Sequence, residues 1–269
     1  MPKSEQNRAE GMANGKEAFH VERLVLRGGR YRGACLREHR GLLDASFMSS
    51  PADFMYGNGL EVLKDVYPVR VVRCRDICLK YYMSRGAKDV LKRWCGMSKG
   101  KRSFRWALAL LSNSIPTPTP VCYLDGQCGD SFYLSGFLAS AGHLADYLQS
   151  VSQKEQKKCL EALSFFLNRM FYRGVYHLDL KGTNVLVHND GPTCQFYLTD
   201  TDAMAFYRKG MYKPLYKSLV RITRTLVPYF SRKELIAFAV RCLYNSPVTI
   251  QPQDVVDRAF KIEKMKQSQ

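Results

Sequence analysis

The sequence predicts an α+β protein of two lobes, and three observations support this. Between about residues 20 and 83 it contains short segments rich in β-branched and aromatic residues, which favour strands. From about residue 143 onwards, apolar residues recur at helical spacing. The 269 residues, 46% of them apolar, suffice for a sizeable core. We therefore expect a small β-rich N-terminal lobe and a larger, mostly helical C-terminal lobe, joined near residues 137–142, with a cleft between them.

The elements follow in order along the chain. In the first part, strands are expected at 60–65, 67–74 and 77–83 and as a pair within 121–138, and helices at 86–95 and 103–113. In the second part, helices are expected at 143–150, 155–173, 213–228 and 231–244, and a hairpin at 184–188 and 195–200. The ends, 1–18 and 262–269, are expected to be flexible tails, which leaves lobes at 19–138 and 139–261.

Composition limits the classes of function. Lys plus Arg (41) exceed Asp plus Glu (24) by 17, which indicates an anionic partner. Nine cysteines without a CxxC pair are typical of reduced thiols, and the spacing of Cys74, Cys78, Cys122 and Cys128 disfavours a zinc site. The sequence shows neither an apolar run of membrane-spanning length nor a secretory signal, so a cytoplasmic protein is expected.

The most informative motif combines three oxygen-bearing side chains with a lysine. Asp179, Lys181 and Asn184 follow His177 in the pattern HxDxKxxN, and Asp200 ends the second strand of the expected hairpin. Phosphoryl transfer from Mg-ATP needs a carboxylate to deprotonate the acceptor, and oxygen ligands to hold the metal. We assign these roles to Asp179 as base, Asn184 and Asp200 as Mg²⁺ ligands, and Lys181 as the residue that stabilises the transferred phosphoryl. Asp202 is the alternative metal ligand, and His177 is expected to be a structural hydrogen-bonding residue.

The stretch HLDLKGTNVLV (177–187) resembles the catalytic loop of the protein-kinase-like superfamily, and within it the bacterial lipopolysaccharide kinase family (Kdo and heptose kinases). Three further stretches are similar to that family: EVLKDVYPVRVVRCRDICLKYY (61–82), RWALALLSNSIPTPTPV (105–121) and FYLTDTDAMAF (196–206). The resemblance implies a two-lobed protein-kinase-like fold, ATP and Mg²⁺ as cofactors, and Lys80 as the lysine that contacts the ATP phosphates. It also implies a sugar hydroxyl of the lipopolysaccharide inner core as acceptor, a lipid-linked Kdo or heptose.

Two departures from the superfamily pattern keep alternatives open. No glycine-rich GxGxxG loop precedes Lys80, and no glutamate occurs between Glu61 and Glu155, so Asp89 is the nearest helical carboxylate that could pair with Lys80. One alternative is a kinase that acts on a protein or small molecule. The other is a pseudokinase scaffold that binds ATP without turnover.

The positive charge is concentrated in two stretches. Residues 85–105 contain eight basic residues against Asp89 alone, and residues 203–233, directly after the metal segment, contain no acidic residue. Aromatic residues interleave with the second stretch, which favours an anionic lipid-linked saccharide as partner and peripheral contact with the inner face of the bacterial inner membrane through basic patches. No nucleic-acid-reading motif is present, so nucleic acid is not expected as a partner.

Overall fold

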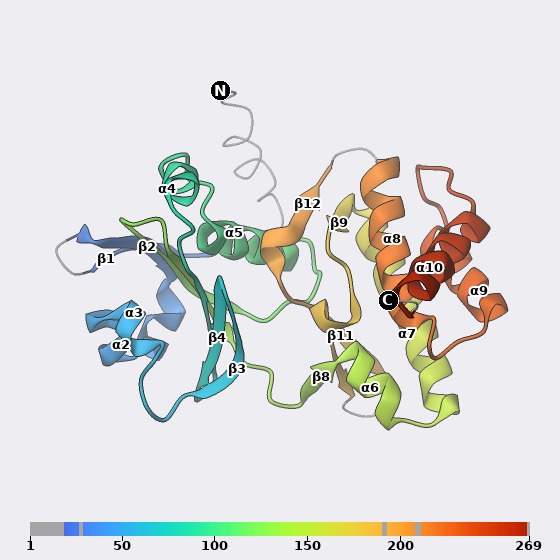
Figure 1. The fold of residues 1–269 in the computed structure, drawn as a ribbon, viewed down its shortest axis with the longest axis horizontal. Helices are drawn as coiled ribbons and strands as arrows, with labels where there is room; N and C mark the ends of the chain where they lie inside the picture. The colour runs from blue at the N-terminus through green and yellow to red at the C-terminus, as the bar shows by residue number, and fades with distance from the viewer. Residues whose placement is uncertain (1–18, 27–28, 190–192, 208–210, 268–269) are drawn as a thin grey trace. The chain divides into compact units, whose positions relative to one another are not determined.

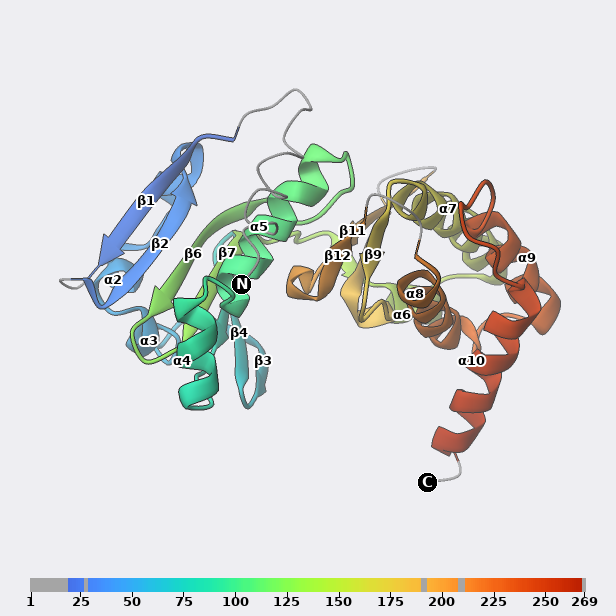
Figure 2. The same ribbon diagram turned by 90° about the horizontal axis from the view of Figure 1, so that it is seen from above.

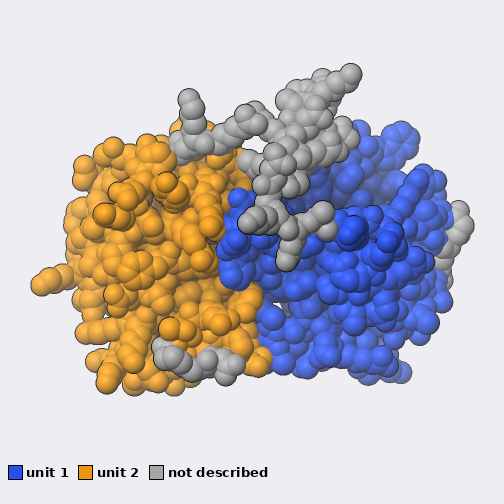
Figure 3. Space-filling view, turned by 180° about the vertical axis from the view of Figure 1, so that it is seen from behind, with its two compact units in different colours: residues 1–139 blue, residues 140–269 orange. Residues whose placement is uncertain are grey.

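The computed structural model describes residues 19–26, 29–189, 193–207 and 211–267. The chain divides into two compact units, residues 1–139 and residues 140–269, which are coloured separately in Figure 3. The expected tail at 1–18 and Arg208 and Lys209 of the second basic stretch lie outside the described residues.

The first unit is built on an antiparallel sheet (Figure 1). Its seven strands lie in the order β1-β2-β6-β7-β5-β4-β3. Their bounds are β1 Val21–Leu26, β2 Tyr31–Leu36, β3 Glu61–Val66, β4 Val69–Cys74, β5 Ile77–Tyr82, β6 Pro120–Gly126 and β7 Ser131–Gly136. The segments expected as strands between 60 and 83 and within 121–138 are therefore strands, and β1 and β2 extend the sheet at one edge.

Side-chain alternation along the strands gives the sheet two apolar faces. One face packs Leu124 and Phe132 against Phe47 of α2 (Ala45–Ser49). Short helices η2 (Arg37–Leu42) and α3 (Pro51–Phe54) flank α2 in sequence. The opposite face packs Tyr123 and Tyr133 against Phe104 of α5 (Lys99–Ser112), which runs along β6 and β7 in Figure 2.

Helix α5 begins four residues earlier than the expected 103. Its N-cap is Ser98, whose hydroxyl accepts a hydrogen bond from the N–H of Lys101. A serine cap stabilises a helix start even where basic residues hide the apolar periodicity. The preceding helix, α4 (Ala87–Trp94), matches the expected helix at 86–95.

The second unit combines helices with two small sheets (Figure 1). Its helices are α6 Leu144–Ser150, α7 Gln153–Tyr172, α8 Tyr212–Leu226, α9 Arg232–Cys242 and α10 Pro252–Gln267. The hairpin β10 (Val185–Asn189) and β11 (Cys194–Leu198) pairs with β8 (Ala141–His143), and β9 (Val175–His177) pairs with β12 (Met204–Phe206). Capping boxes at Ser152 and Ser231 fix the starts of α7 and α9.

Helix α10 corrects the expectation of a flexible tail from residue 262. The helix extends through residues 262–267, and its residues Val255, Val256 and Ala259 are fully buried. It packs against α8 and α9, so tertiary contact on one apolar stripe stabilises a helix whose last turn is highly charged.

Candidate active site

The loop between β9 and β10 is anchored by a buried histidine. His177 has no exposed surface, and its Nδ1 accepts a hydrogen bond from the N–H of Asp179 (3.2 Å). Nε2 therefore carries the proton and donates to the carbonyl of Thr199 (2.8 Å). Burial lowers the pKa of His177, although the carboxylates of Asp200 and Asp179 act in the opposite direction. A neutral histidine bonded at both nitrogens positions the loop and has no free nitrogen to act as a base.

Asp179 lies at the centre of a group of polar side chains from this loop. Its Oδ2 is 3.1 Å from Nζ of Lys181 and accepts a hydrogen bond from Nδ2 of Asn184 at 3.3 Å. The same Nδ2 also donates to the backbone carbonyl of Asp179 (2.9 Å). The 3-10 helix η3 (Gly182–Asn184) turns the chain so that a residue five positions later faces the aspartate. The structure thus brings three of the five expected site residues together.

Helix α8 supplies contacts to this loop that the sequence did not reveal. Three of its residues face the loop, and Figure 1 shows α8 beside β9. Ser218 Oγ donates to the carbonyl of His177 (2.9 Å), Arg221 Nη1 pairs with Oδ1 of Asp179, and Thr225 Oγ1 accepts from the N–H of Gly182 (3.0 Å). Positions 218, 221 and 225 share one helix face, so α8 holds the loop at three successive points.

The approach of α8 is close enough to require glycine at position 182. A Cβ added there would lie 2.4 Å from Cγ2 of Thr225. Gly182 is therefore needed for packing between the loop and α8.

Asp200 is connected to the loop through its neighbour. The N–H of Thr199 donates to the carbonyl of Asn184 (3.0 Å), and the carbonyl of Thr199 accepts from His177. Asp200 itself adopts a left-handed conformation (φ 57°, ψ 44°) at the start of the 3-10 helix η4 (Thr201–Ala203). Two segments distant in sequence are thereby placed side by side at the ends of β9 and β11.

The side-chain oxygen atoms of Asn184 and Asp200 are of the kind that binds a hard cation. Both side-chain hydrogen bonds that Asn184 makes within the described part of the chain are donated by Nδ2, so Oδ1 is available as a ligand. Amide and carboxylate oxygens are the ligands that Mg²⁺ prefers. Within the described residues, no cluster of three or more His, Cys, Asp or Glu is found.

Lys80 belongs to the first unit, near the end of β5. The strand lies between β4 and β7, with Lys80 opposite Val71 and Tyr133, and its Nζ is 5.2 Å from the ring centroid of Tyr82. The hypothesis that Asp89 pairs with Lys80 is wrong. The carboxylate of Asp89 instead contacts Arg85 Nε (3.3 Å) and Lys92 Nζ (3.5 Å). Both cations are close in sequence, since Lys92 lies in the same helix, α4, and Arg85 just precedes it.

A sheet-rich unit with a lysine on an inner strand, and a helical unit whose loop gathers Lys181 and Asn184 around Asp179, form the arrangement expected of a protein-kinase-like phosphotransferase. Residues 66–204, just over half of the chain, match the model of the lipopolysaccharide kinase (Kdo/WaaP) family. The chain therefore belongs to this family, and it is a sugar kinase of lipopolysaccharide biosynthesis that transfers phosphate to a hydroxyl group.

Solved structures share the fold. A structure of WaaP in complex with acyl carrier protein has a TM-score of 0.54 at 14% identity, over 92% of this chain and 97% of that chain. Weaker likeness is found to the bifunctional kinase-methyltransferase WbdD (TM-score 0.47, 13% identity, 73% and 43% of the two chains). It is also found to the PknI kinase domain of Mycobacterium tuberculosis (0.45, 12%, 75% and 93%). No curated protein matches the sequence. Within the described residues, no helix has the length and apolar character needed to span a bilayer.

Proposed function

We propose that this protein transfers the γ-phosphoryl group of ATP to a hydroxyl of an anionic, lipid-linked Kdo or heptose in the lipopolysaccharide inner core. The observation that carries the proposal is the convergence of Lys181, Asn184 and Arg221 on the carboxylate of Asp179. Together with the family, it supports a site in which a held carboxylate receives the proton of a sugar hydroxyl.

The hydrogen bonds of Asp179 indicate which oxygen acts. A carboxylate oxygen has two lone pairs. Among the described side chains, Oδ2 already faces two donors, Lys181 and Asn184, whereas Oδ1 faces one, Arg221. We therefore assign Oδ1 as the atom that accepts the proton, with Arg221 beside the position of the acceptor hydroxyl.

The remaining residues have distinct roles in this proposal. Asn184 and Asp200 hold Mg²⁺, which when bound neutralises charge on the phosphates of ATP. Lys181, whose side chain is 48% exposed, is within reach of the transferred group and stabilises its charge. Lys80 binds the ATP phosphates from the first unit.

The start of α8 offers a surface for the lipid-linked acceptor. Lys213 and Lys217 are exposed there, and Met211 and Tyr212 are 43% and 50% exposed. The ring of Tyr212 stacks on Tyr216 with centroids 5.6 Å apart. Each basic residue near an anionic membrane surface contributes about 1 kcal/mol to attachment. This supports a cytoplasmic enzyme that acts at the inner face of the inner membrane.

The central test is the replacement Asp179→Asn, which keeps the shape of the side chain and removes its basicity. We expect kcat to fall about 10²- to 10⁴-fold, as for the loss of a general base. Asp254→Asn, at an exposed position of α10, is the matched control and should keep full activity. Phosphate transfer from labelled ATP to lipopolysaccharide core acceptors is measured, and Asp179→Asn with near wild-type turnover would contradict the assignment.

The same assay distinguishes the two alternatives. Label in the lipid fraction of a cell-envelope extract supports the proposal, whereas label in protein bands alone indicates a protein kinase. Nucleotide binding without transfer to any acceptor indicates a pseudokinase.

A further inference from the structure

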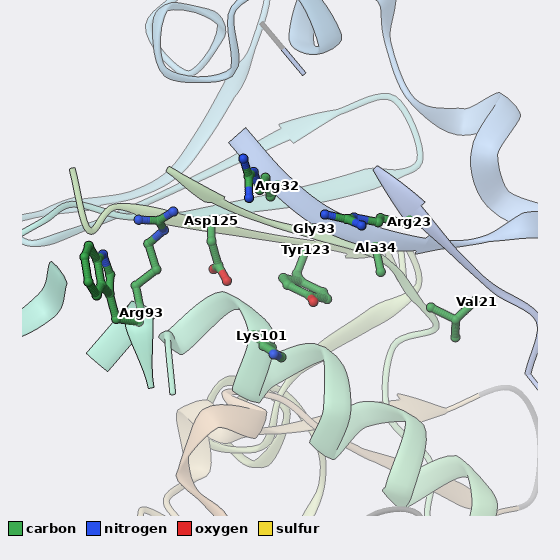
Figure 4. Close-up of a pocket in the computed structure, with 10 residues that line it drawn as sticks. Val21, Arg23, Arg32, Gly33, Ala34, Arg93, Lys101, Tyr123 and Asp125 are labelled. Carbon is green, nitrogen blue, oxygen red and sulfur yellow. The ribbon is translucent and has the colours of Figure 1, made fainter. Parts of the chain in front are cut away.

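A second charged site lies in the first unit, among residues that the proposed chemistry does not use. A hollow of about 600 Å³ is lined by β1, β2, β6, α4 and the first turn of α5 (Figure 4). Its polar lining consists of Arg23, Arg32, Arg93, Lys101, Tyr123 and Asp125. In Figure 4 the side chains of Tyr123 and Asp125 point from the sheet towards Lys101 on α5.

Strand register explains why these side chains share one face. Ala34 of β2 lies between Arg23 of β1 and Tyr123 of β6. Arg32, two residues before Ala34 on β2, lies opposite Asp125 of β6. Alternation therefore places all five side chains on the sheet face that α5 covers further along. Small residues on β2 leave space for the hollow among these side chains. Ala34 contributes only a methyl group, and it follows Gly33, where an added Cβ would lie 1.8 Å from the carbonyl oxygen of Tyr123.

The cations in this hollow greatly outnumber the carboxylates. Arg23 and Arg32 are exposed on the strands, and none of the four cations forms an ion pair within the part of the chain that the structure describes. Among the described residues, the Arg93 guanidinium donates one long hydrogen bond, to the carbonyl of Gln127 (3.4 Å). Like charges gathered on a concave surface create a potential that attracts anions.

The one carboxylate is already engaged in holding the fold. Asp125 is 8% exposed and accepts a hydrogen bond from Ser98 Oγ (2.5 Å), which joins the sheet to the N-cap of α5. Burial raises the pKa of Asp125 to about 6, while Ser98, Lys101 and Arg93 act in the opposite direction. Even with Asp125 ionised, the four cations and Asp125 together carry a net charge of +3.

We propose that the hollow between Arg23, Arg32, Arg93 and Lys101 is a binding site for a phosphate group carried by a lipid headgroup or a soluble phosphate compound. Arginine recognises phosphate through its planar fork of donors, and three of the four cations are arginines. Trp94 lines the same hollow and is 79% exposed, so it provides an apolar contact at the rim. The site does not depend on the phosphotransferase mechanism, since none of its residues belongs to the catalytic loop.

Tryptophan fluorescence of the full chain tests the site directly. The protein has two tryptophans, so Trp106→Phe leaves Trp94 as the reporter at the rim of the hollow. One arm titrates this variant with pyrophosphate, and the other with vesicles of phosphatidylglycerol and phosphatidylcholine against phosphatidylcholine alone. We expect a saturable change in Trp94 emission in at least one arm, weakened by salt. The responding arm identifies the source of the phosphate group.

Paired variants connect the signal to the hollow. Arg23→Thr with Arg32→Thr removes two exposed strand cations and should weaken binding at least tenfold. Lys154→Ala with Lys158→Ala removes two exposed cations from α7 and should leave the affinity for the phosphate probe unchanged. Pyrophosphate bound at the ATP site would be insensitive to the first pair. The proposal is overturned if neither arm changes Trp94 emission, or if the first pair binds like the second. Kinase activity towards a soluble acceptor should persist in both pairs, so failure here leaves the proposed function intact.

Discussion

Replacing Arg221 tests whether α8 takes part in catalysis or only in packing. Arg221 is the one residue outside the catalytic loop that pairs with Asp179 within the described residues, and it contacts the oxygen that we assign as the proton acceptor. In Arg221→Ala the Oδ1 side of the carboxylate loses the one side-chain donor that it has among the described residues. Asp179 remains held through Oδ2 by Lys181 and Asn184, so it should be placed less accurately but stay in the site.

The expected magnitude follows from the exposure of the pair. The side chains of Arg221 and Asp179 are 35% and 34% exposed, between a surface pair and a buried one. Exposed ion pairs contribute about 0–1 kcal/mol, and hydrogen bonds to charged groups about 1.5–3 kcal/mol. A loss of roughly 1–2 kcal/mol in the transition state corresponds to a fall in kcat of about 5- to 30-fold. The free energy of unfolding should change by about 1 kcal/mol or less.

Steady-state kinetics with a matched arginine control provides the measurement. Arg224 lies on the same helix and pairs with Glu263 of α10 (3.5 Å) and not with the loop. We expect Arg221→Ala to lower kcat with KM for ATP unchanged, Arg221→Lys to recover part of the loss, and Arg224→Ala to match the wild type. The reasoning is refuted if Arg221→Ala has the same kcat as Arg224→Ala, or a higher kcat than the wild type, while both variants remain folded.

Further predictions concern stability. Gly182→Ala should lower activity and stability because of the 2.4 Å contact with Cγ2 of Thr225, and Thr225→Ser in the same chain should restore much of both, since serine keeps the hydroxyl and lacks the methyl group. Thermal unfolding and kinetics of the single and double variants check this; no rescue would mean that the clash lies elsewhere. Gly174→Ala should cost several kcal/mol, as φ is +68° and the new Cβ would lie 2.0 Å from the carbonyl oxygen of Tyr207; a soluble variant of wild-type melting temperature would contradict it. Because the folded state raises the pKa of Asp125 from 3.8 to about 6, it binds the proton more tightly than the unfolded state, and this contribution to stability is lost as the pH rises through 6. Relative to Asp125→Asn, the wild type should therefore lose up to about 3 kcal/mol of unfolding free energy between pH 4 and 7, and denaturant titrations with parallel pH profiles would refute this.

Local sequence patterns were sufficient to predict which residues of the 177–184 loop come together, but not which residues of α8 hold that loop in place. The HxDxKxxN spacing predicted that Asp179, Lys181 and Asn184 act together, and the structure places them around one carboxylate. Arg221 was visible only as one member of a basic stretch, because a charge run does not indicate which member points inwards. The polar residues at 218, 221 and 225 do share one face of α8 with buried Ile222, and this spacing is a signal that could have revealed them.

The fold was predictable where the sequence pattern is strong. Strands in 60–83 and 121–138 and the helices from α6 to α9 follow from periodicity alone. Helix α10 was not expected, because its apolar stripe is short and its stability comes from packing on α8 and α9. The hypothesis of an Asp89–Lys80 pair failed for a similar reason: sequence shows which carboxylates are available, but not that Arg85 and Lys92 lie nearer.

The backbone at Asp200 restricts which side chains that position can hold. Left-handed φ and ψ angles disfavour most residues, and aspartate and asparagine are the side-chain-bearing residues that adopt them most readily. Both also carry side-chain oxygen atoms of the kind that Mg²⁺ prefers, so the backbone geometry and the proposed metal binding select the same small set of amino acids. An alanine scan would therefore confound two effects at this position, since Asp200→Ala adds conformational strain to the loss of the proposed metal ligand. Asp200→Asn keeps the turn and changes only the charge, which makes it the informative substitution for metal binding.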